Sequence, residues 1–208
     1  MVLDLLLLIV VAIISALAAG GARRYALRNS LVDWPLSRSS HKQATPRGGG
    51  LAIALVFLGG LLGLFFLDGV PIHIFLSLLS GGLLVAGVGF ADDHGHVPAR
   101  WRSSVHFLAA IIALTLLGGL PPVPFGGAVV DLGLFGDALT AVFIVWMINL
   151  FNFMDGIDGI AAVEVIFVAG GAWLIAAIPE GSYVGVILGL LIASTLGFLV
   201  WNWPPAKI

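Results

Sequence analysis

The segment Ala138-Leu-Thr-Ala-Val-Phe-Ile-Val-Trp-Met-Ile-Asn149-Leu-Phe-Asn152-Phe-Met-Asp155-Gly-Ile-Asp158-Gly decides how the chain is interpreted. Its first half is apolar enough to lie in a membrane, and its second half places two amides and two carboxylates at three-residue steps. Residues three apart share a helix face, so the spacing predicts one slanted polar stripe at the end of a spanning helix. Polar groups in hydrocarbon are costly and are usually retained for a function. A helix end that leaves the bilayer, capped by Asp and Gly, is the simpler alternative.

The composition is that of a membrane protein. Hydrophobic residues make up 60% of the chain and charged residues 10%, whereas soluble domains contain about a quarter charged residues. Seven apolar segments each approach the length of about 20 residues that a spanning helix requires. They cover residues 2–20, 51–67, 72–91, 104–120, 138–153, 161–178 and 183–201. We therefore predict an all-α polytopic membrane bundle of about seven transmembrane helices, forming one membrane domain over residues 1–208.

The distribution of basic residues predicts the orientation. All nine Lys and Arg residues lie in alternate connectors, and the opposite connectors carry only acids. The positive-inside rule then places the N-terminus outside and the basic connectors in the cytoplasm. The predicted cytoplasmic loops cover about residues 21–50, 92–103, 154–160 and 202–208. Cysteine is absent, which excludes a disulfide framework and a thiolate nucleophile or metal ligand.

A basic, glycine-rich loop is the first polar group on the predicted cytoplasmic side. It contains His41, Arg47 and the glycines Gly48, Gly49 and Gly50. Such a loop can bring backbone N–H groups close to an anion, with the basic side chains as counter-charges. A positive-inside anchor followed by a flexible turn is the alternative.

Adjacent carboxylates, Asp92 and Asp93, form the second group. Adjacent carboxylates repel each other, which suits either a metal site or a proton acceptor; an Asp helix cap at the membrane surface is the alternative. His94 and His96, two residues apart, are interpreted as interfacial loop residues rather than zinc ligands. His106 either hydrogen-bonds a substrate or caps a helix, and the sequence does not separate the two.

These groups suit phosphoryl transfer at a membrane surface. The natural substrates are a soluble phosphorylated donor and a lipid-phosphate acceptor, because phosphoryl transfer depends mostly on positioning and on charge neutralisation. Oxygen ligands without cysteine favour Mg²⁺, with Mn²⁺ as the alternative. No nucleic-acid partner is expected, and an oligomer is compatible with the sequence. The Trp201-Asn-Trp203-Pro-Pro stretch predicts an aromatic belt at the membrane interface.

The chain resembles the polyprenyl-phosphate N-acetylhexosamine-1-phosphate transferases, also called glycosyltransferase family 4. The resemblance rests on three ordered motifs: His41…Thr45-Pro-Arg47-Gly-Gly-Gly, Gly89-Phe-Ala-Asp92-Asp93 and Asn149-x-x-Asn152-x-x-Asp155-Gly-x-Asp158-Gly. The Pro-Arg-Gly-Gly-Gly form looks more like the branch that initiates O-antigen (and hence lipopolysaccharide), enterobacterial common antigen or teichoic-acid linkage synthesis than like the phospho-MurNAc-pentapeptide branch. The resemblance implies that a UDP-N-acetylamino sugar donates its sugar-1-phosphate to undecaprenyl phosphate. It further implies release of UMP, use of Mg²⁺ and a location in the bacterial inner membrane.

The resemblance also implies roles for individual residues. Asp92 or Asp93 would deprotonate or orient the lipid phosphate, and Arg102 would pair with phosphate. Asn152, Asp155 and Asp158 would bind the nucleotide diphosphate and help to organise the metal. The remaining expected substrate-binding residues are His41, Arg47, Gly48, Gly49 and Asn149. The expected metal ligands are Asp92, Asp93 and Asp155.

One departure from the family pattern concerns the end of the sequence at Ile208. Family members continue into a Gly-Asp-x-Gly-Ser segment whose Asp is the principal Mg²⁺ ligand. The resemblance therefore implies that this chain corresponds to the N-terminal two-thirds of the family fold and is inactive alone. A non-catalytic remnant or subunit is the first alternative. An ion-coupled transporter is the second, although the acids cluster at one face and no internal repeat is seen.

Overall fold

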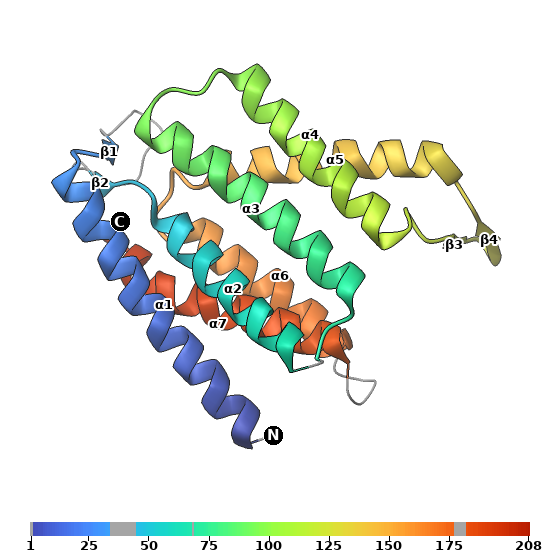
Figure 1. Cartoon of the computed structure of the whole chain (residues 1–208), viewed down its shortest axis with the longest axis horizontal. Coiled ribbons are helices and arrows are strands. Elements are labelled where there is room, and N and C mark those ends of the chain that lie inside the picture. Colours follow the sequence, from blue (N-terminus) through green and yellow to red (C-terminus); the bar gives the residue numbers. More distant parts are fainter. Residues whose placement is uncertain (1, 34–44, 68, 177–181) are drawn as a thin grey trace. The chain divides into compact units, whose positions relative to one another are not determined.

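The computed structural model describes residues 2–33, 45–67, 69–176 and 182–208. Within these residues the chain is predominantly helical, which confirms the predicted all-α membrane class (Figure 1). The helices are α1 (Val2–Arg28), α2 (Gly49–Phe66), α3 (Ile72–His94), α4 (Ala99–Leu117), α5 (Gly133–Met154), α6 (Ile160–Ala176) and α7 (Tyr183–Asn202). Each overlaps one of the seven apolar segments of the sequence.

Five of the helices in the described part of the chain are long and apolar enough to cross a membrane. They are α1, α2, α3, α5 and α7. The apolar helix α6 is shorter, and α4 begins with a polar turn that contains Arg100 and Arg102. The chain is thus a multi-pass membrane protein.

Several helices extend beyond their predicted apolar segments, among them α1 and α3 at their C-terminal ends. α1 continues to Arg28, so Arg23 and Arg24 lie on a helix and not in a connecting loop. α3 continues through Asp92 and Asp93 to His94. The physical reason is that a helix satisfies its own backbone hydrogen bonds and need not stop where the apolar sequence stops.

The chain divides into two compact units. The first comprises Met1–Gly69 with Phe153–Ile208, and the second comprises Val70–Asn152. The first unit contains α1, α2, α6 and α7, with α7 packed against the other three. Small residues line α7 where it meets its neighbours, and Ser15 of α1 donates a hydrogen bond to the Ser194 carbonyl at 2.5 Å. Small residues let helix backbones approach closely, which is how helices associate in lipid.

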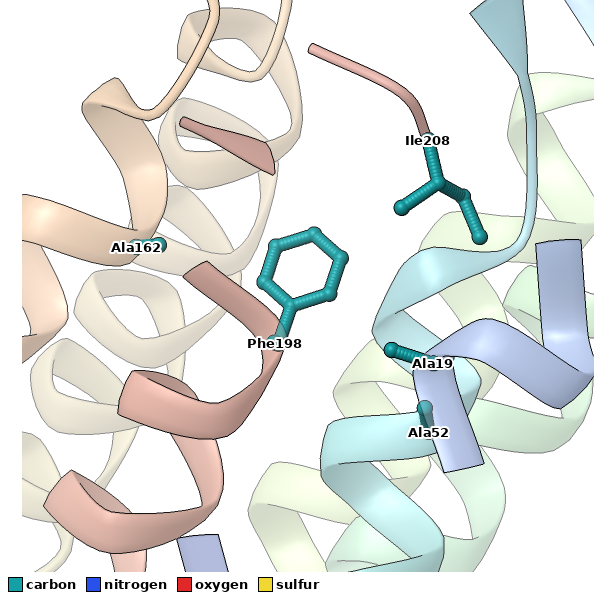
Figure 2. Close-up of a cluster of buried hydrophobic side chains, with 5 residues drawn as sticks. All are labelled: Ala19, Ala52, Ala162, Phe198 and Ile208. Carbon is teal, nitrogen blue, oxygen red and sulfur yellow. The ribbon is translucent and has the colours of Figure 1, made fainter. Parts of the chain in front are cut away.

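A buried cluster joins all four helices of the first unit. It consists of Ala19, Ala52, Ala162, Phe198 and Ile208, and Figure 2 shows the Phe198 ring between the small side chains with Ile208 beside it. Ile208 is only 5% exposed. The last residue of the sequence is therefore part of the core.

Residues 203–208, which we call the C-terminal strap, turn back onto the first unit. The Lys207 N–H donates to the Trp201 carbonyl at 2.8 Å, and Arg23 Nε donates to the Lys207 carbonyl at 2.9 Å. Trp201 Nε1 in turn donates to the Ala16 carbonyl at 2.8 Å. The predicted aromatic belt does not account for the packing of Trp201 against α1. Trp201 is half-buried there, and of the two tryptophans only Trp203 is well exposed.

The second unit contains α3, α4 and most of α5. α3 packs against α4, and α4 shares a buried cluster with α5 that consists of Ala110, Leu114, Ala141 and Val145. A short hairpin, β3 (Val123–Phe125) and β4 (Ala128–Val130), connects α4 to α5. Gly126 and Gly127 both have positive φ (56° and 87°), as a two-residue type I′ turn requires.

The first unit also contains one antiparallel strand pair, β1 (Val32–Asp33) and β2 (Thr45–Pro46), between α1 and α2. Both strand pairs lie outside the apolar segments. They are consistent with the prediction that strands do not span the bilayer.

Candidate active site

The carboxylate of Asp92 is held at the junction of α3 and α4. The α3 helix ends at His94, where the Gly95 N–H donates to the Ala91 carbonyl at 3.0 Å, and α4 begins after Pro98. Asp92 Oδ1 accepts a hydrogen bond from the Val97 N–H at 2.9 Å. Its Oδ2 accepts one from Arg102 at 2.5 Å. The structure thus brings together Asp92 and Arg102, two of the residues that the sequence predicts for phosphate chemistry.

This ion pair is partly accessible. The side chains of Arg102 and Asp92 are 32% and 24% exposed. A guanidinium carries five N–H donors in a planar fork that suits carboxylate and phosphate oxygens. Arg102 can therefore hold Asp92 and still present donors to a second anion.

The neighbouring residues of this junction differ in exposure. Asp93 is half-buried on the last turn of α3. His94 and His96 are exposed, and His94 Nδ1 lies 2.8 Å from the Phe90 carbonyl. No group of three or more His, Asp or Glu side chains in the described ranges could hold a metal ion. His94 is the last residue of α3 and His96 lies in the connection to α4, so the interpretation of both histidines as loop residues holds only for His96.

The polar stripe predicted over residues 149–158 is only half helical. α5 ends at Met154, so Asn149 and Asn152 lie on its last turns while Asp155 and Asp158 lie in the following turn. Asn149 is held against its own helix, because Nδ2 donates to the Val145 carbonyl at 2.7 Å. The single helical stripe was a wrong prediction, since α5 ends at Met154 and residues 155–159 form turns before α6 begins at Ile160.

Asp158 is fixed to the C-terminal strap within the first unit. Its Oδ2 accepts a hydrogen bond from the Ala206 N–H at 3.0 Å. The next residue, Gly159, donates its N–H to Asn202 Oδ1 at 3.0 Å, and Asn202 Nδ2 donates to the Ile208 carbonyl at 2.8 Å. The turn that carries Asp158 is thus positioned by residues more than forty places later in the sequence.

Asn202 is a functional-site neighbour that sequence reasoning missed. It is 9% exposed, and its amide satisfies one backbone donor and one backbone acceptor. The position of an Asn between two tryptophans gives no sign of these partners. The only available signal was its polarity in an otherwise apolar segment.

Replacing Asn202 by alanine is expected to destabilise the first unit by about 2–4 kcal/mol, because two buried backbone groups lose their partner. Asn29→Ala is the matched control. Asn29 Nδ2 donates to one exposed carbonyl, that of Tyr25, at 2.9 Å, so this variant should lose less than about 1 kcal/mol. Unfolding in mixed micelles measures both, and equal losses would contradict the positioning role of Asn202.

The three glycines after Arg47 have different structural roles. Gly48 precedes α2 with a φ of 91°, a left-handed conformation that glycine adopts without strain. Gly49 is buried, and a Cβ there would collide with the Phe198 ring. Gly50 is exposed with open space around its Cα. Gly48 and Gly49 are thus required by the fold, which favours a structural explanation for these two residues over the expected substrate binding.

A pair of substitutions separates these roles. Gly49→Ala is expected to destabilise the protein by about 1–3 kcal/mol, since the added methyl group forces Phe198 to move within the core. Gly50→Ala should leave stability unchanged or raise it by up to about 1 kcal/mol, as alanine favours a helix. Thermal unfolding measures both, and similar effects of the two substitutions would refute the assignment of roles.

The remaining predicted residues are distributed over both units. Arg47 is exposed, and its N–H donates to the Leu31 carbonyl at 3.0 Å. His41 lies outside the described residues. Of the predicted metal ligands, Asp92 and Asp93 belong to the second unit and Asp155 to the first. The metal assignment therefore stays a prediction.

Comparison with known proteins identifies the family. A family model described as glycosyl transferase family 4 matches residues 75–208. The chain belongs to glycosyl transferase family 4. The matched region of this family 4 member includes the Asp92–Arg102 pair, the Asn and Asp residues of 149–158 and the C-terminal strap.

Curated relatives of this family 4 chain carry related names. It is 32% identical to a probable undecaprenyl-phosphate N-acetylglucosaminyl 1-phosphate transferase of Bacillus subtilis, over 89% of this chain and 52% of the relative. It is 31% identical to a decaprenyl-phosphate N-acetylglucosaminephosphotransferase of Mycobacterium tuberculosis, over 95% and 53%. It is 30% identical to a phospho-N-acetylmuramoyl-pentapeptide-transferase of Caulobacter, over 80% and 54%. The chain spans about half the length of these relatives.

Proposed function

We propose that this protein takes part in the transfer of an N-acetylamino sugar-1-phosphate from a UDP-sugar to undecaprenyl phosphate at the cytoplasmic face of the bacterial inner membrane. The observation that carries the proposal is the Asp92–Arg102 pair at the start of α4. Relatives at about a third identity are named for transfer to polyprenyl phosphates. The lipid-linked product would initiate a cell-surface polysaccharide such as O-antigen or a teichoic-acid linkage unit.

The proposed reaction displaces UMP in a single exchange of phosphorus–oxygen bonds. An oxygen of the lipid phosphate forms a bond to the sugar-bearing phosphorus of the donor. The bond from that phosphorus to the bridging oxygen breaks, and UMP leaves with that oxygen. When the acceptor phosphate carries a proton, Asp92 or Asp93 accepts it.

The ion pair gives this proton transfer a second effect. A protonated Asp92 no longer attracts the Arg102 guanidinium as an ion. The guanidinium then turns toward the phosphate, which carries an additional negative charge after it loses its proton. The pair would thus couple deprotonation of the acceptor to its binding.

Mg²⁺ is the cofactor that we propose, with Mn²⁺ as the alternative, on the basis of carboxylate chemistry. When bound, the ion would neutralise charge on the diphosphate of the donor. Within the second unit Asp93 would supply a ligand, whereas Asp92 fits less well because donors already face both its oxygens. The described residues do not assemble a complete ion site.

The test separates binding from turnover. The protein in lipid nanodiscs is expected to bind radiolabelled undecaprenyl phosphate and not undecaprenol. UMP and labelled lipid product are measured separately, with UDP-N-acetylglucosamine and UDP-N-acetylgalactosamine as donors and with or without Mg²⁺. Equal binding of the phosphate and the alcohol would refute the proposed function. UMP release by this 208-residue chain would refute the expectation that it is inactive alone.

A further inference from the structure

His106 is a buried polar side chain that the proposed chemistry does not use. It lies on the second turn of α4 and is 6% exposed. No described residue forms a hydrogen bond with its Nδ1. Buried polar atoms almost always have a partner, because an unpaired one costs about as much as a lost hydrogen bond. His106 is therefore placed to receive a partner from outside the described part of the chain.

The position of His106 on its helix connects it to the ion pair. His106 follows Arg102 by four residues, so the two side chains share one face of α4 and are one turn apart. Ala110 and Leu114 continue this face and are buried in the cluster shared with α5. His106 thus lies between the ion pair at the start of α4 and the apolar packing below it.

α5 extends this arrangement from the other side. In Figure 1, α4 leads into the β3–β4 hairpin and α5 returns from it, so the two helices run in opposite senses. Asn149 follows Val145 by four residues and continues the clustered face of α5 by one turn. His106 on α4 and Asn149 on α5 therefore each lie one helical turn beyond a residue of the shared cluster, Ala110 and Val145.

A phosphate on a lipid fits these groups better than a free anion. Arg102 offers a charged fork and His106 an imidazole N–H on the same helix face, so two phosphate oxygens can each accept a hydrogen bond. α4 also exposes the large apolar side chain of Leu117, which follows His106 by eleven residues and lies close to the same helix face. A ligand with an anionic head and a long apolar tail matches this sequence of surfaces along one helix.

We propose that His106 is a binding residue for the acceptor, with its Nδ1–H donating to an oxygen of the lipid phosphate that Arg102 also holds. The inference rests on the proposed function and adds a residue and a role to it. The ligand class is a phosphate monoester on an isoprenoid chain. The phosphate oxygen then gives the buried Nδ1 the hydrogen-bond partner that no described residue provides.

Binding of undecaprenyl phosphate to the protein in nanodiscs tests the inference. His106→Leu is expected to weaken binding about tenfold to hundredfold, the effect of losing a hydrogen bond to a charged group. His106→Asn should stay within about threefold of the unaltered protein, since the Asn amide nitrogen occupies nearly the position of Nδ1. His73→Leu is the matched control, because His73 is exposed at the far end of α3 and should not affect binding.

A spectroscopic measurement keeps the test independent of folding defects. In protein labelled with ¹⁵N-histidine, the Nδ1 resonance of His106 is expected to shift on addition of undecaprenyl phosphate. Undecaprenol, inorganic phosphate and UMP should leave it unchanged. An unshifted resonance, or full binding by a folded His106→Leu variant, would overturn the inference.

The outcomes distinguish this inference from the proposed function. If Arg102→Ala weakens lipid-phosphate binding and His106→Leu does not, the proposed function stands and the role of His106 is refuted. If the unaltered protein does not bind undecaprenyl phosphate, both are refuted. If His106→Leu weakens inorganic phosphate binding equally, the assignment to a lipid phosphate is refuted.

Discussion

The Arg102→Ala variant is expected to bind undecaprenyl phosphate about tenfold to hundredfold more weakly than the unaltered protein. The substitution removes the guanidinium that faces Asp92 and would otherwise bind the acceptor. A hydrogen bond to a charged group contributes about 1.5–3 kcal/mol, which corresponds to this range of affinity. Equilibrium binding of the radiolabelled lipid in nanodiscs measures the effect directly.

Stability should change much less than binding in this variant. The ion pair is partly exposed, and exposed pairs contribute about 1 kcal/mol or less. The charge-swapped double variant, Asp92→Arg with Arg102→Asp, is the control, because it preserves attraction between the two positions. It should regain thermal stability relative to either single reversal without regaining binding. Recovery of binding in the swapped protein would show that the pair is only a structural link.

The second large effect concerns the contact between α1 and α7. Gly197→Ala is expected to destabilise the protein by about 3 kcal/mol, the upper part of the usual range for overpacking. A Cβ at this position would collide with the Ala12 carbonyl oxygen and would lie 2.6 Å from Ser15 Cβ and 2.8 Å from the Ala16 nitrogen. Two of these atoms belong to the backbone, so the strain cannot be relieved by a side-chain rotation. Unfolding by SDS in mixed micelles measures the loss.

Gly171→Ala in α6 is the matched control for Gly197→Ala. No atom lies within 4 Å of a Cβ built at Gly171, and alanine is the better helix former by about 1 kcal/mol. The control should be as stable as the unaltered protein or slightly more stable. A destabilised Gly171→Ala variant would mean that glycine itself, rather than the α1–α7 contact, sets the stability of these helices.

Helix positions were predictable from the sequence because they depend on local composition. The segments 72–91 and 183–201 are close to the observed α3 and α7, since an apolar run of membrane length has only a helix available to it. For the Asp92–Arg102 contact, the residue types were predictable from the sequence and their pairing was not. The residue types and their order indicated phosphate chemistry, while their pairing depends on the turn through Val97.

The rest depends on contacts between distant parts of the chain. A three-residue spacing suggested that Asp155 and Asp158 continue a helical stripe, but α5 ends at Met154 and both residues lie in the following turns. The partners of Asp158 and Asn202 lie 48 and 43 residues away along the chain. Nothing in the local pattern around these residues indicates such partners. The buried position of His106 likewise requires the packing of α4, which the sequence alone does not give.

The contacts of α1 have a consequence for how the protein is made. α1 leaves the ribosome well before α7, yet Ser15, Ala16 and Arg23 form their hydrogen bonds with residues 179 to 185 positions later. Closing such long-range contacts is slow, because the intervening chain must be ordered first. During synthesis α1 therefore remains without these hydrogen-bond partners until α7 and the C-terminal strap have been synthesised. Nascent chains released before Trp201 would present an unpaired α1, and membrane quality-control proteases would have a helix to recognise.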